Sequence, residues 1–343
     1  MRFFILLVIT SFLLISCGQN EPNAKNGKTP IRFPHVVKRD TPKGIGAQML
    51  KRLVNEDSDL SEKFKFEVYP EAVLYDDENV IDALLNNKIQ FAAPSLSIFS
   101  KKADQEKQSK FQKDFSDFVA QSQQGFDKFD GSSFANVAAV QTFQANEEGQ
   151  KLLHSVEKIC KNTENGEKNC LVGLHYWHNG MKQLSTKKPC PADGSERSED
   201  ALKRFIKDLT FRIQDSAVIK QEFDERWRAK GLFVPFSKTS KALRDGRFKG
   251  QNVDGQENTW TNILAEGYNK DQNCFIETNH GYLGYIVLTN KKFWDALEAP
   301  KRTSLENKLN EVTEKVNLIA EKYNQRDRGK LEKGGAKILV LQK

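Results

Sequence analysis

Two short stretches carry the side chains best suited to hold a charged ligand. The first, residues 211–214, places Arg212 inside an apolar, strand-like run, where a lone guanidinium is costly unless an anion meets it. Because side chains alternate along a strand, Arg212 and Gln214 share one face. The second stretch, residues 253–258, is a turn-like Asp-Gly followed by amide and carboxylate groups that can fix a polar ligand. Arg212 either grips a ligand carboxylate with two parallel hydrogen bonds or forms a salt bridge within the protein, and the first reading predicts a receptor for a small anion.

Motifs for catalysis, cofactors and metals are not evident in the sequence. The glycines of residues 44–46 lack the third glycine of a nucleotide-binding loop. Residues 254–258 lack the alternating ligand spacing of a calcium loop, and the two histidines of residues 175–178 have no cysteine or carboxylate partners for zinc. No nucleophile–base pair is visible either. We therefore expect a non-enzymatic protein without cofactor or metal.

Composition argues against nucleic acid as a partner. The chain has 343 residues and a formal net charge of +7, with basic and acidic residues interspersed rather than clustered. Nucleic-acid binding requires clustered positive charge, so the basic excess indicates a solvated, lysine-rich surface. The length has room for two domains, and 38% hydrophobic residues indicate a globular body rather than a membrane bundle.

The N-terminus predicts export and a lipid anchor. Met1 and Arg2 precede an apolar run over residues 3–15, which is shorter than the roughly 20 residues of a membrane span. The run ends in Leu-Ile-Ser before Cys17, which resembles a bacterial lipobox, so residues 1–16 are predicted as a signal peptide and residues 17–29 as a polar tether. The alternative is an ordinary signal peptide with an incidental cysteine. The expected location is extracytoplasmic, in the periplasm or at the cell surface, on a membrane reached through the lipid.

Four further cysteines would then lie in an oxidising compartment, which favours disulfides. They are Cys160, Cys170, Cys190 and Cys274. Three pairings are possible. One bridge could close the polar loop between Cys160 and Cys170, which would leave Cys190 with Cys274, and this pairing is our hypothesis.

The periodicity of apolar residues predicts an α/β protein with two such units. In the first half we expect strands at 31–33, 64–69 and 89–94 and helices at 47–54 and 79–85. In the second half we expect strands near 171–174, 211–213, 232–236 and 282–289, helices at 202–209 and 305–323, and a polar turn at 278–281. The polar stretch 101–133 has phenylalanines spaced as in an amphipathic helix that covers a core.

This alternation of strands and helices indicates mainly parallel sheets with crossover helices. Ligands of such sheets bind at the carboxyl ends of the strands. The loops at 35–40 and 95–97 are therefore candidate ligand contacts.

Several short sequence motifs occur in the order in which a known family has them. They are FPHVV and TPKG (33–37, 41–44), VYP and LYDD (68–70, 74–77), APSLS (93–97), YWHNG (176–180), FRIQ (211–214), PFS (235–237), VDGQEN (253–258) and TNHGYLGY (278–285). Together they resemble the extracytoplasmic solute-binding subunit of a TRAP transporter, of the DctP family and close to its C4-dicarboxylate-binding branch.

The resemblance implies a two-domain clamp of the type II periplasmic-binding-protein kind, with a mixed, mainly parallel sheet in each lobe and a long bridging helix. Lobe I is expected at 30–178 plus 278–298 and lobe II at 179–277 plus 299–343. A monomer of this kind would close on an organic acid and deliver it to the membrane subunits of a permease.

The resemblance also implies a set of ligand-binding residues. The carboxylate arginine of the family falls on Arg212, and a second basic contact falls on Lys182, where relatives usually have arginine. The pocket amide falls on Asn258, an aromatic wall on Phe236, and the contacts of the other lobe on His35 and Ser97. Trp177 is either a contact or a core residue.

The function that follows is capture of a C4-dicarboxylate such as succinate, fumarate or malate. Two alternatives stay open. One is a different organic acid, such as a sialic, aromatic or keto acid. The other is a diverged surface lipoprotein without a role in transport.

Overall fold

The computed structural model describes residues 27–100, 138, 141, 142, 144–163, 166–191 and 198–341. The strands are β1 (Thr29–Pro34), β2 (Phe64–Tyr69), β3 (Phe91–Ala92), β4 (Cys160–Asn162), β5 (Lys168–Thr186), β6 (Thr210–Ile213), β7 (Lys230–Phe233), β8 (Arg247–Phe248), β9 (Gln251–Asn252), β10 (Gly255–Asn258), β11 (Cys274–Asn290) and β12 (Ile338–Val340). The helices are α1 (Pro42–Glu56), α2 (Ser58–Lys63), α3 (Val80–Leu85), α6 (Glu147–Ser155), α7 (Glu199–Ile206), α8 (Ala217–Gln221), α9 (Phe236–Asp245), α10 (Trp260–Ala265), α11 (Lys291–Asp295) and α12 (Ala299–Lys333). Four short helical turns are η1 (Leu96–Ser100), η2 (Val156–Lys158), η3 (Glu222–Arg226) and η4 (Tyr268–Lys270).

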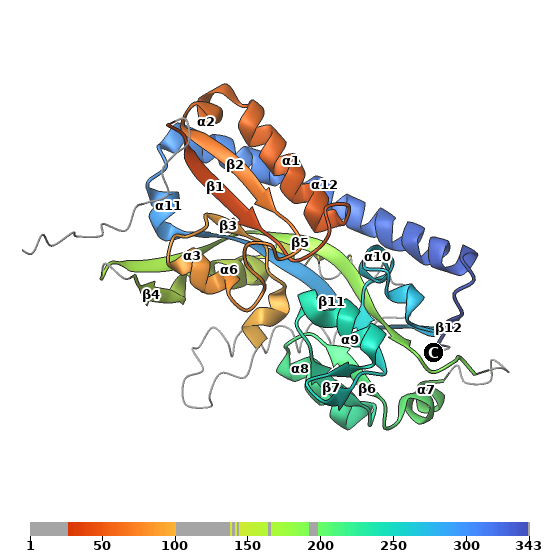
Figure 1. The fold of residues 1–343 in the computed structure, drawn as a ribbon. Helices are drawn as coiled ribbons and strands as arrows, with labels where there is room; N and C mark the ends of the chain where they lie inside the picture. The colour runs from red at the N-terminus through yellow and green to blue at the C-terminus, as the bar shows by residue number, and fades with distance from the viewer. Residues whose placement is uncertain are drawn as a thin grey trace, which may run out of the picture.

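Two long strands, β5 and β11, cross the middle of the molecule, and the long helix α12 runs beside α1 (Figure 1). On one side of β5 and β11 lie β1, β2, α1 and α2, and on the other lie β6, β7, α8 and α9. We refer to the first side as lobe I and the second as lobe II. The larger sheet has the order β12-β11-β5-β10-β6-β7, with β3 paired to β11 and β4 to β5, while β1 and β2 form a separate parallel pair. This mixed α/β architecture is the fold class expected from the sequence.

β5 and β11 pair antiparallel over nearly their whole lengths, with a shift of register between Ile276 and Gly281. Residues 278–281, predicted as a turn, belong to β11, so that prediction was wrong. Gln183 explains the difference, because its Oε1 accepts the backbone N–H groups of Thr278 (2.9 Å) and Asn279 (3.1 Å). The Gln183 side chain takes the place of the backbone acceptors that the partner strand does not supply at the register shift. β11 therefore continues through the polar stretch as a strand and does not turn back.

The remaining elements differ from the sequence prediction mainly at their ends. The strands at 31–33, 64–69 and 211–213 and the helices at 47–54 and 305–323 are confirmed. The strand predicted at 89–94 shortens to the two residues of β3, and the one at 232–236 ends at Phe233 because Pro235 precedes the first turn of α9. The helix predicted within 101–133 and the segment with Cys17 lie outside the described residues.

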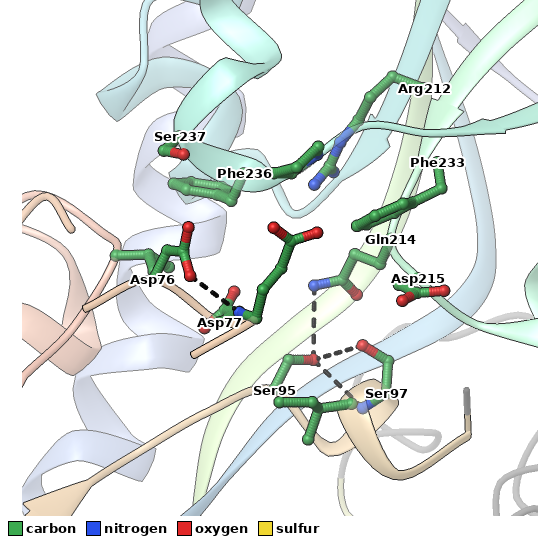
Figure 2. Close-up of a pocket in the computed structure, with 14 residues that line it drawn as sticks. Asp76, Asp77, Ser95, Ser97, Arg212, Gln214, Asp215, Phe233, Phe236 and Ser237 are labelled. Atoms are coloured by element: carbon green, nitrogen blue, oxygen red, sulfur yellow. Dashed lines mark hydrogen bonds between the residues drawn. The ribbon is translucent and has the colours of Figure 1, made fainter. Parts of the chain in front are cut away.

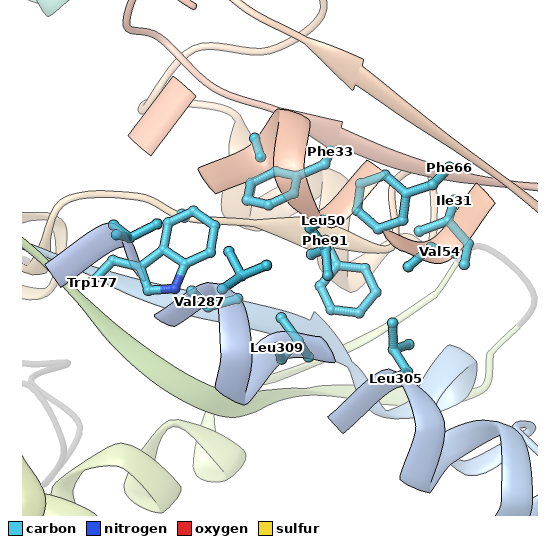
Figure 3. Packing of buried hydrophobic residues seen from close by; sticks show 14 of the residues in the cluster. Ile31, Phe33, Leu50, Val54, Phe66, Phe91, Trp177, Val287, Leu305 and Leu309 are labelled. Carbon is cyan, nitrogen blue, oxygen red and sulfur yellow. The ribbon is translucent and has the colours of Figure 1, made fainter. Parts of the chain in front are cut away.

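The core of lobe I is rich in aromatic rings (Figure 3). The ring of Phe33 lies 5.9 Å from that of Trp177 and 6.4 Å from that of Phe91, and helix α12 covers them with aliphatic side chains. Large rings bury much apolar area per residue, so this cluster holds β1, β3, β5 and α12 together as one unit.

α12 reaches both lobes. It has 35 residues, which corresponds to about 52 Å at 1.5 Å per residue. Near its start, Leu305 and Leu309 pack in the lobe I cluster, and near its end Leu331 packs with Val234 and Ile263 of lobe II. The apolar spacing of three and four residues along the helix explains the buried stripe.

Polar side chains fix α12 to β5 between these two ends. Thr313 accepts the indole N–H of Trp177 (2.9 Å), and Asn317 accepts the backbone N–H of His178 (2.8 Å). Asn324 donates to a backbone carbonyl of the same strand at 2.6 Å. The helix is therefore attached to the strand that crosses both lobes.

The loop between β1 and α1 has a defined shape. Thr41 caps α1 by accepting the N–H of Gly44 (3.3 Å), and Pro42 occupies the first helical turn. A Cβ at Gly44 would lie 2.2 Å from the carbonyl oxygen of Lys38, so only glycine fits this approach. The turn fixes the position of Lys43 at the start of the helix.

Two disulfides occur in the described structure. Cys160 is bonded to Cys170 across the β4–β5 pair, and Cys190 is bonded to Cys274 at the start of β11. This is the pairing hypothesised from the sequence. The residues joined are 10 apart in the first bridge and 84 apart in the second.

The two bridges should differ in their contribution to stability. Loop-closure entropy predicts a loss of about 4–5 kcal/mol on removing the Cys190–Cys274 bridge and about 3 kcal/mol on removing Cys160–Cys170. Urea unfolding of the two double Cys→Ser variants measures both losses. An equal or larger loss from the short-loop variant would show that chain entropy does not govern their effect.

Candidate ligand-binding site

Arg212 lies in β6, between Gln256 of β10 and Leu232 of β7. Its side chain is 1% exposed. Nε donates to the carbonyl oxygen of Val234 at 3.0 Å, whereas Nη1 is buried and has no hydrogen-bond partner in the described structure. Within the described residues no carboxylate lies within 4.0 Å of the guanidinium, so the internal salt bridge considered above is not formed there. A buried guanidinium in this state suits an anion supplied by a ligand.

A cavity opens beside Arg212, between the two lobes (Figure 2). Lobe I lines it with Val36, Asp76, Asp77, Glu78, Ser95, Ser97 and Ile98, and lobe II with Arg212, Gln214, Asp215, Phe233, Pro235, Phe236 and Ser237. The ring of Phe236, at the first turn of α9, has its centroid 5.9 Å from the guanidinium carbon of Arg212. The ring therefore forms an apolar wall that also favours the cation.

Gln214 connects the two walls. Its Nε2 donates to Oγ of Ser95 at 3.4 Å, and Ser95 in turn lies 3.0 Å from Oγ of Ser97 (Figure 2). The carbonyl Oε1 of Gln214 is buried without a partner in the described structure. A second contact between the lobes runs from Nζ of Lys38 to the carbonyl oxygen of Ala265 at 2.6 Å. The lobes are thus in contact at two places.

Lys182 is buried in β5 but does not line this cavity. Its Nζ lies 2.8 and 3.1 Å from the two carboxylate oxygens of Glu257. Glu257 also accepts the backbone N–H of Gln214 at 3.0 Å and lies 3.6 Å from Nε2 of His280. Lys182 is therefore neutralised within the protein, and through Glu257 it supports the strand that carries Arg212.

The pKa values of this pair follow from burial and attraction. Burial alone raises the pKa of Glu257, but Lys182 and His280 outweigh it and hold that pKa at about 2. Burial lowers the pKa of Lys182, and the Glu257 carboxylate opposes that shift. The Glu257 carboxylate is therefore ionised at neutral pH and favours the charged form of Lys182.

Asn258 and Trp177 also lie away from the wall of the cavity. Oδ1 of Asn258 accepts from the backbone N–H of Thr259 (3.0 Å) and from Nδ2 of Asn262 (2.8 Å), which fixes the start of α10. Trp177 is fully buried in the aromatic core of lobe I. Of the residues expected at the site, the structure brings Arg212, Phe236 and Ser97 together around the cavity.

His35 follows β1 directly and is 3% exposed. Both of its ring nitrogens are buried without partners in the described structure. Burial and the charge of Lys43 lower the pKa of His35 to about 3, so the imidazole is neutral at physiological pH. A neutral imidazole has one donor and one acceptor, and both are unsatisfied here.

Gln214 and Lys43 were not predicted as site residues from the sequence, whereas Ser95 belongs to the loop 95–97 that was. The sequence could have indicated Gln214 as a site residue, because it shares a strand face with Arg212. Lys43 belongs to the Thr-Pro-Lys-Gly motif, but no function was predicted for it. In the structure it is 1% exposed, and burial lowers its pKa to about 8 against the opposing charge of Asp77.

Two further findings concern metal ligands and membrane spans in the described residues. Across the described ranges there is no group of three or more histidine, cysteine or acidic side chains arranged to hold a metal ion. None of the helices in the same part of the chain is long and apolar enough to cross a membrane.

Two lobes that share long strands and have a cavity with a buried arginine between them have the architecture of a clamp-type solute-binding protein. The chain belongs to the DctP family, bacterial extracellular solute-binding protein family 7, whose model matches residues 33–343. It is a TRAP solute-binding protein, and the family resemblance seen in the sequence is confirmed. The family consists of transport proteins rather than enzymes.

Two relatives named for C4-dicarboxylate binding are similar over most of the chain. The C4-dicarboxylate-binding periplasmic protein DctP of Vibrio cholerae is 34% identical over 338 residues, which cover 98% of this chain and 87% of the relative. The DctP protein of Rhodobacter capsulatus is 32% identical over 297 residues, covering 86% and 75%.

Solved structures agree with these matches. A TRAP periplasmic solute-binding protein from Shewanella oneidensis with bound succinate has a TM-score of 0.72 and 30% identity, and the match covers 92% of this chain and 88% of that chain. One from Pseudomonas aeruginosa with bound L-malate has a TM-score of 0.71 and 35% identity, covering 92% and 93%.

The Lys182–Glu257 pair should behave as a coupled unit. Lys182→Met alone leaves a buried carboxylate unpaired and should lower the free energy of unfolding by about 3–5 kcal/mol. Adding Glu257→Gln removes the charge and keeps an acceptor for the Gln214 N–H, so the double variant should be more stable than the single one. Urea unfolding of the set measures the coupling. Additive losses in the double variant would contradict it.

Proposed function

We propose that this chain captures a C4-dicarboxylate such as succinate, fumarate or malate and delivers it to the membrane subunits of a TRAP permease. The observation that carries the proposal is the buried guanidinium of Arg212, which faces the cleft with Nη1 unpartnered. The relatives named for C4-dicarboxylates and the structures holding succinate and malate support this ligand class. The protein would act by binding alone, without a catalytic step.

Each site residue has a proposed role in this binding. Arg212 pairs with one ligand carboxylate, and Phe236 and Ser97 bound the cleft from opposite lobes. Asn258 acts indirectly, because its side-chain amide fixes the start of α10. Lys182 acts indirectly, because its pairing with Glu257 holds the Arg212 strand.

Closure of the lobes would strengthen these contacts. The boundaries proposed from the sequence are 30–178 plus 278–298 for lobe I and 179–277 plus 299–343 for lobe II, with α12 in contact with both cores. A ligand that touches both lobes only in the closed form shifts the population towards that form. Closure also removes the ion pair from water, where its attraction is weakest. We propose that one chain suffices, so that the receptor works as a monomer.

Replacing Arg212 should remove binding without unfolding the protein. Arg212→Ala deletes one partner of a buried charge pair, which costs about 2–5 kcal/mol, or at least about a thirtyfold loss in succinate affinity. Isothermal titration calorimetry measures the affinity. The matched control is Arg204→Ala, an exposed arginine on α7. Unchanged affinity in the Arg212 variant would refute the assignment.

A thermal-shift screen of the unaltered protein against organic acids separates the alternatives. Stabilisation by succinate, fumarate or malate supports the proposed ligand class. Stabilisation only by a sialic, aromatic or keto acid would point to another ligand within the same family, and no stabilisation would favour a surface lipoprotein without a transport role.

The lipid anchor rests on the sequence around Cys17. We propose that the mature protein begins at this residue and is held at a membrane by its acyl chains, because a multiply acylated cysteine binds membranes stably. Cys17→Ser should move the protein from the membrane fraction to the soluble fraction and abolish labelling with a fatty-acid analogue. Labelling that persists in the variant would exclude this cysteine as the anchor.

A further inference from the structure

We propose that the loop between β2 and α3, residues 70–79, docks onto the membrane subunits of the permease and that Val73 and Leu74 are its apolar contact. The inference rests on the proposed function, because a receptor that delivers a ligand to a permease must touch it. Neither of the two side chains lines the ligand cavity. The partner surface that fits this loop has an apolar hollow surrounded by basic side chains.

Val73 and Leu74 expose apolar surface side by side in this loop. Val73 is 70% exposed and Leu74 is 37% exposed. In the described part of the chain, the other exposed large apolar side chains are Leu318 in α12 and Val340 in β12, which lie in separate elements. Single exposed apolar residues are common on protein surfaces, whereas adjacent ones mark an interaction site. The pair in the loop is therefore the candidate contact.

The backbone before this pair is held in a strained conformation. Glu71 and Ala72 have φ angles of 57° and 56°, in the left-handed region that residues other than glycine rarely adopt. Their N–H groups donate to the carbonyl oxygens of Val37 (3.2 Å) and His35 (3.0 Å), which fixes the loop to the segment after β1. Strained backbone of this kind gathers at functional sites. A loop that is already fixed also loses little conformational entropy when a partner binds it.

The charge of the loop indicates the chemistry of the partner. Residues 71–78 contain four acidic side chains and no basic one, in a chain whose net charge is +7. Glu71 and Glu78 are exposed. Negative charge around an apolar contact favours a partner with positive charge at the matching positions. It also disfavours the anionic surface of a membrane, so the partner is a protein and not the lipid itself.

A groove lies beside the apolar pair. It has a volume of about 400 Å³, and its walls include Leu74, Tyr75, Asp82 and Lys88. A side chain of the partner can enter this groove while Leu74 enters the hollow of the partner. Interfaces are tightest where such side chains fill pockets on the opposite surface.

The loop also adjoins lobe II, so a partner seated on it lies where the two lobes meet. At one end, Asp76 and Asp77 line the ligand cavity together with Phe236 of lobe II (Figure 2). At the other end, Glu71 lies close to Glu266 of lobe II. Burial raises the pKa of Glu266 to about 6, and the negative charge of Glu71 adds to that shift. A partner bound here can therefore distinguish the closed protein from the open one.

Uptake of radiolabelled succinate by cells tests the docking surface. In the bacterium that carries this gene, the gene is replaced by variants, and calorimetry measures the succinate affinity of each purified variant. Val73→Ser combined with Leu74→Ser should lower uptake at limiting succinate at least about tenfold, because a few apolar residues carry most of the energy of an interface. Affinity for succinate and the unfolding temperature should not change. The matched control is Leu318→Ser, an exposed leucine on α12, which should leave uptake unchanged.

Glu71→Lys tests the chemistry assigned to the partner. Reversing the charge beside the apolar pair should lower uptake, because a lysine would face the basic side chains of the partner. Succinate affinity should stay the same, since Glu71 does not line the cavity. Uptake that is unchanged or raised in this variant would overturn the basic chemistry.

A photoreactive benzophenone amino acid in place of Leu74 identifies the partner directly. Crosslinking to an integral membrane protein, absent when the same group replaces Leu318, supports the docking surface. Crosslinking only to soluble proteins, a second copy of this chain included, or to none would overturn it. Full uptake in the double serine variant would overturn it too, as would lost uptake matched by an equal loss of succinate affinity.

Failure of the proposed function has a different signature. An unaltered protein that binds no dicarboxylate would overturn the ligand assignment. The crosslink at Leu74 would still decide whether this loop docks onto a membrane protein, because it does not depend on which ligand is carried.

Discussion

A guanidinium buried without a counter-ion is the constraint on which the rest of this structure depends. Arg212 lies in β6 with Nε donating to Val234, while its buried Nη1 has no hydrogen-bond partner in the described structure. Burying this charge costs free energy, which the packing of the surrounding apolar core offsets. Phe211 and Ile213 belong to that core. The same cost becomes the driving force for binding, since an anion that pairs with Arg212 removes it.

The Lys182–Glu257 pair shows why only some buried cations in this chain are available to a ligand. The family resemblance implies that Lys182 is a basic ligand contact, yet its charge is balanced by Glu257 at 2.8 Å. Because Glu257 also accepts the Gln214 N–H, the pair holds the backbone next to the cleft. Charge alone therefore does not identify a binding residue in such a sequence, because the partner of each cation must be known.

Much of the fold could be predicted from the sequence, and the errors have local physical causes. Alternation identified the strand with Arg212, and helical spacing identified α1 and α12. The polar stretch 278–281 was misread as a turn because the Gln183 side chain, from a strand distant in the sequence, completes its hydrogen bonding. Lys43 was overlooked for a similar reason. A lysine near a helix start usually faces solvent, and only the tertiary structure shows it buried over Tyr285.

The attachment of α12 to β5 has a mechanical consequence. Thr313 and Asn324 span about 16 Å of the helix, and each is hydrogen-bonded to residues of the same strand. On the strand the two bonds end at Trp177 and Asn179, only two residues apart, so the helix is fastened to one short segment of β5. The helix cannot slide or roll over this segment without breaking those bonds. Any movement of one lobe relative to the other must then bend the chain on either side of this fixed crossing.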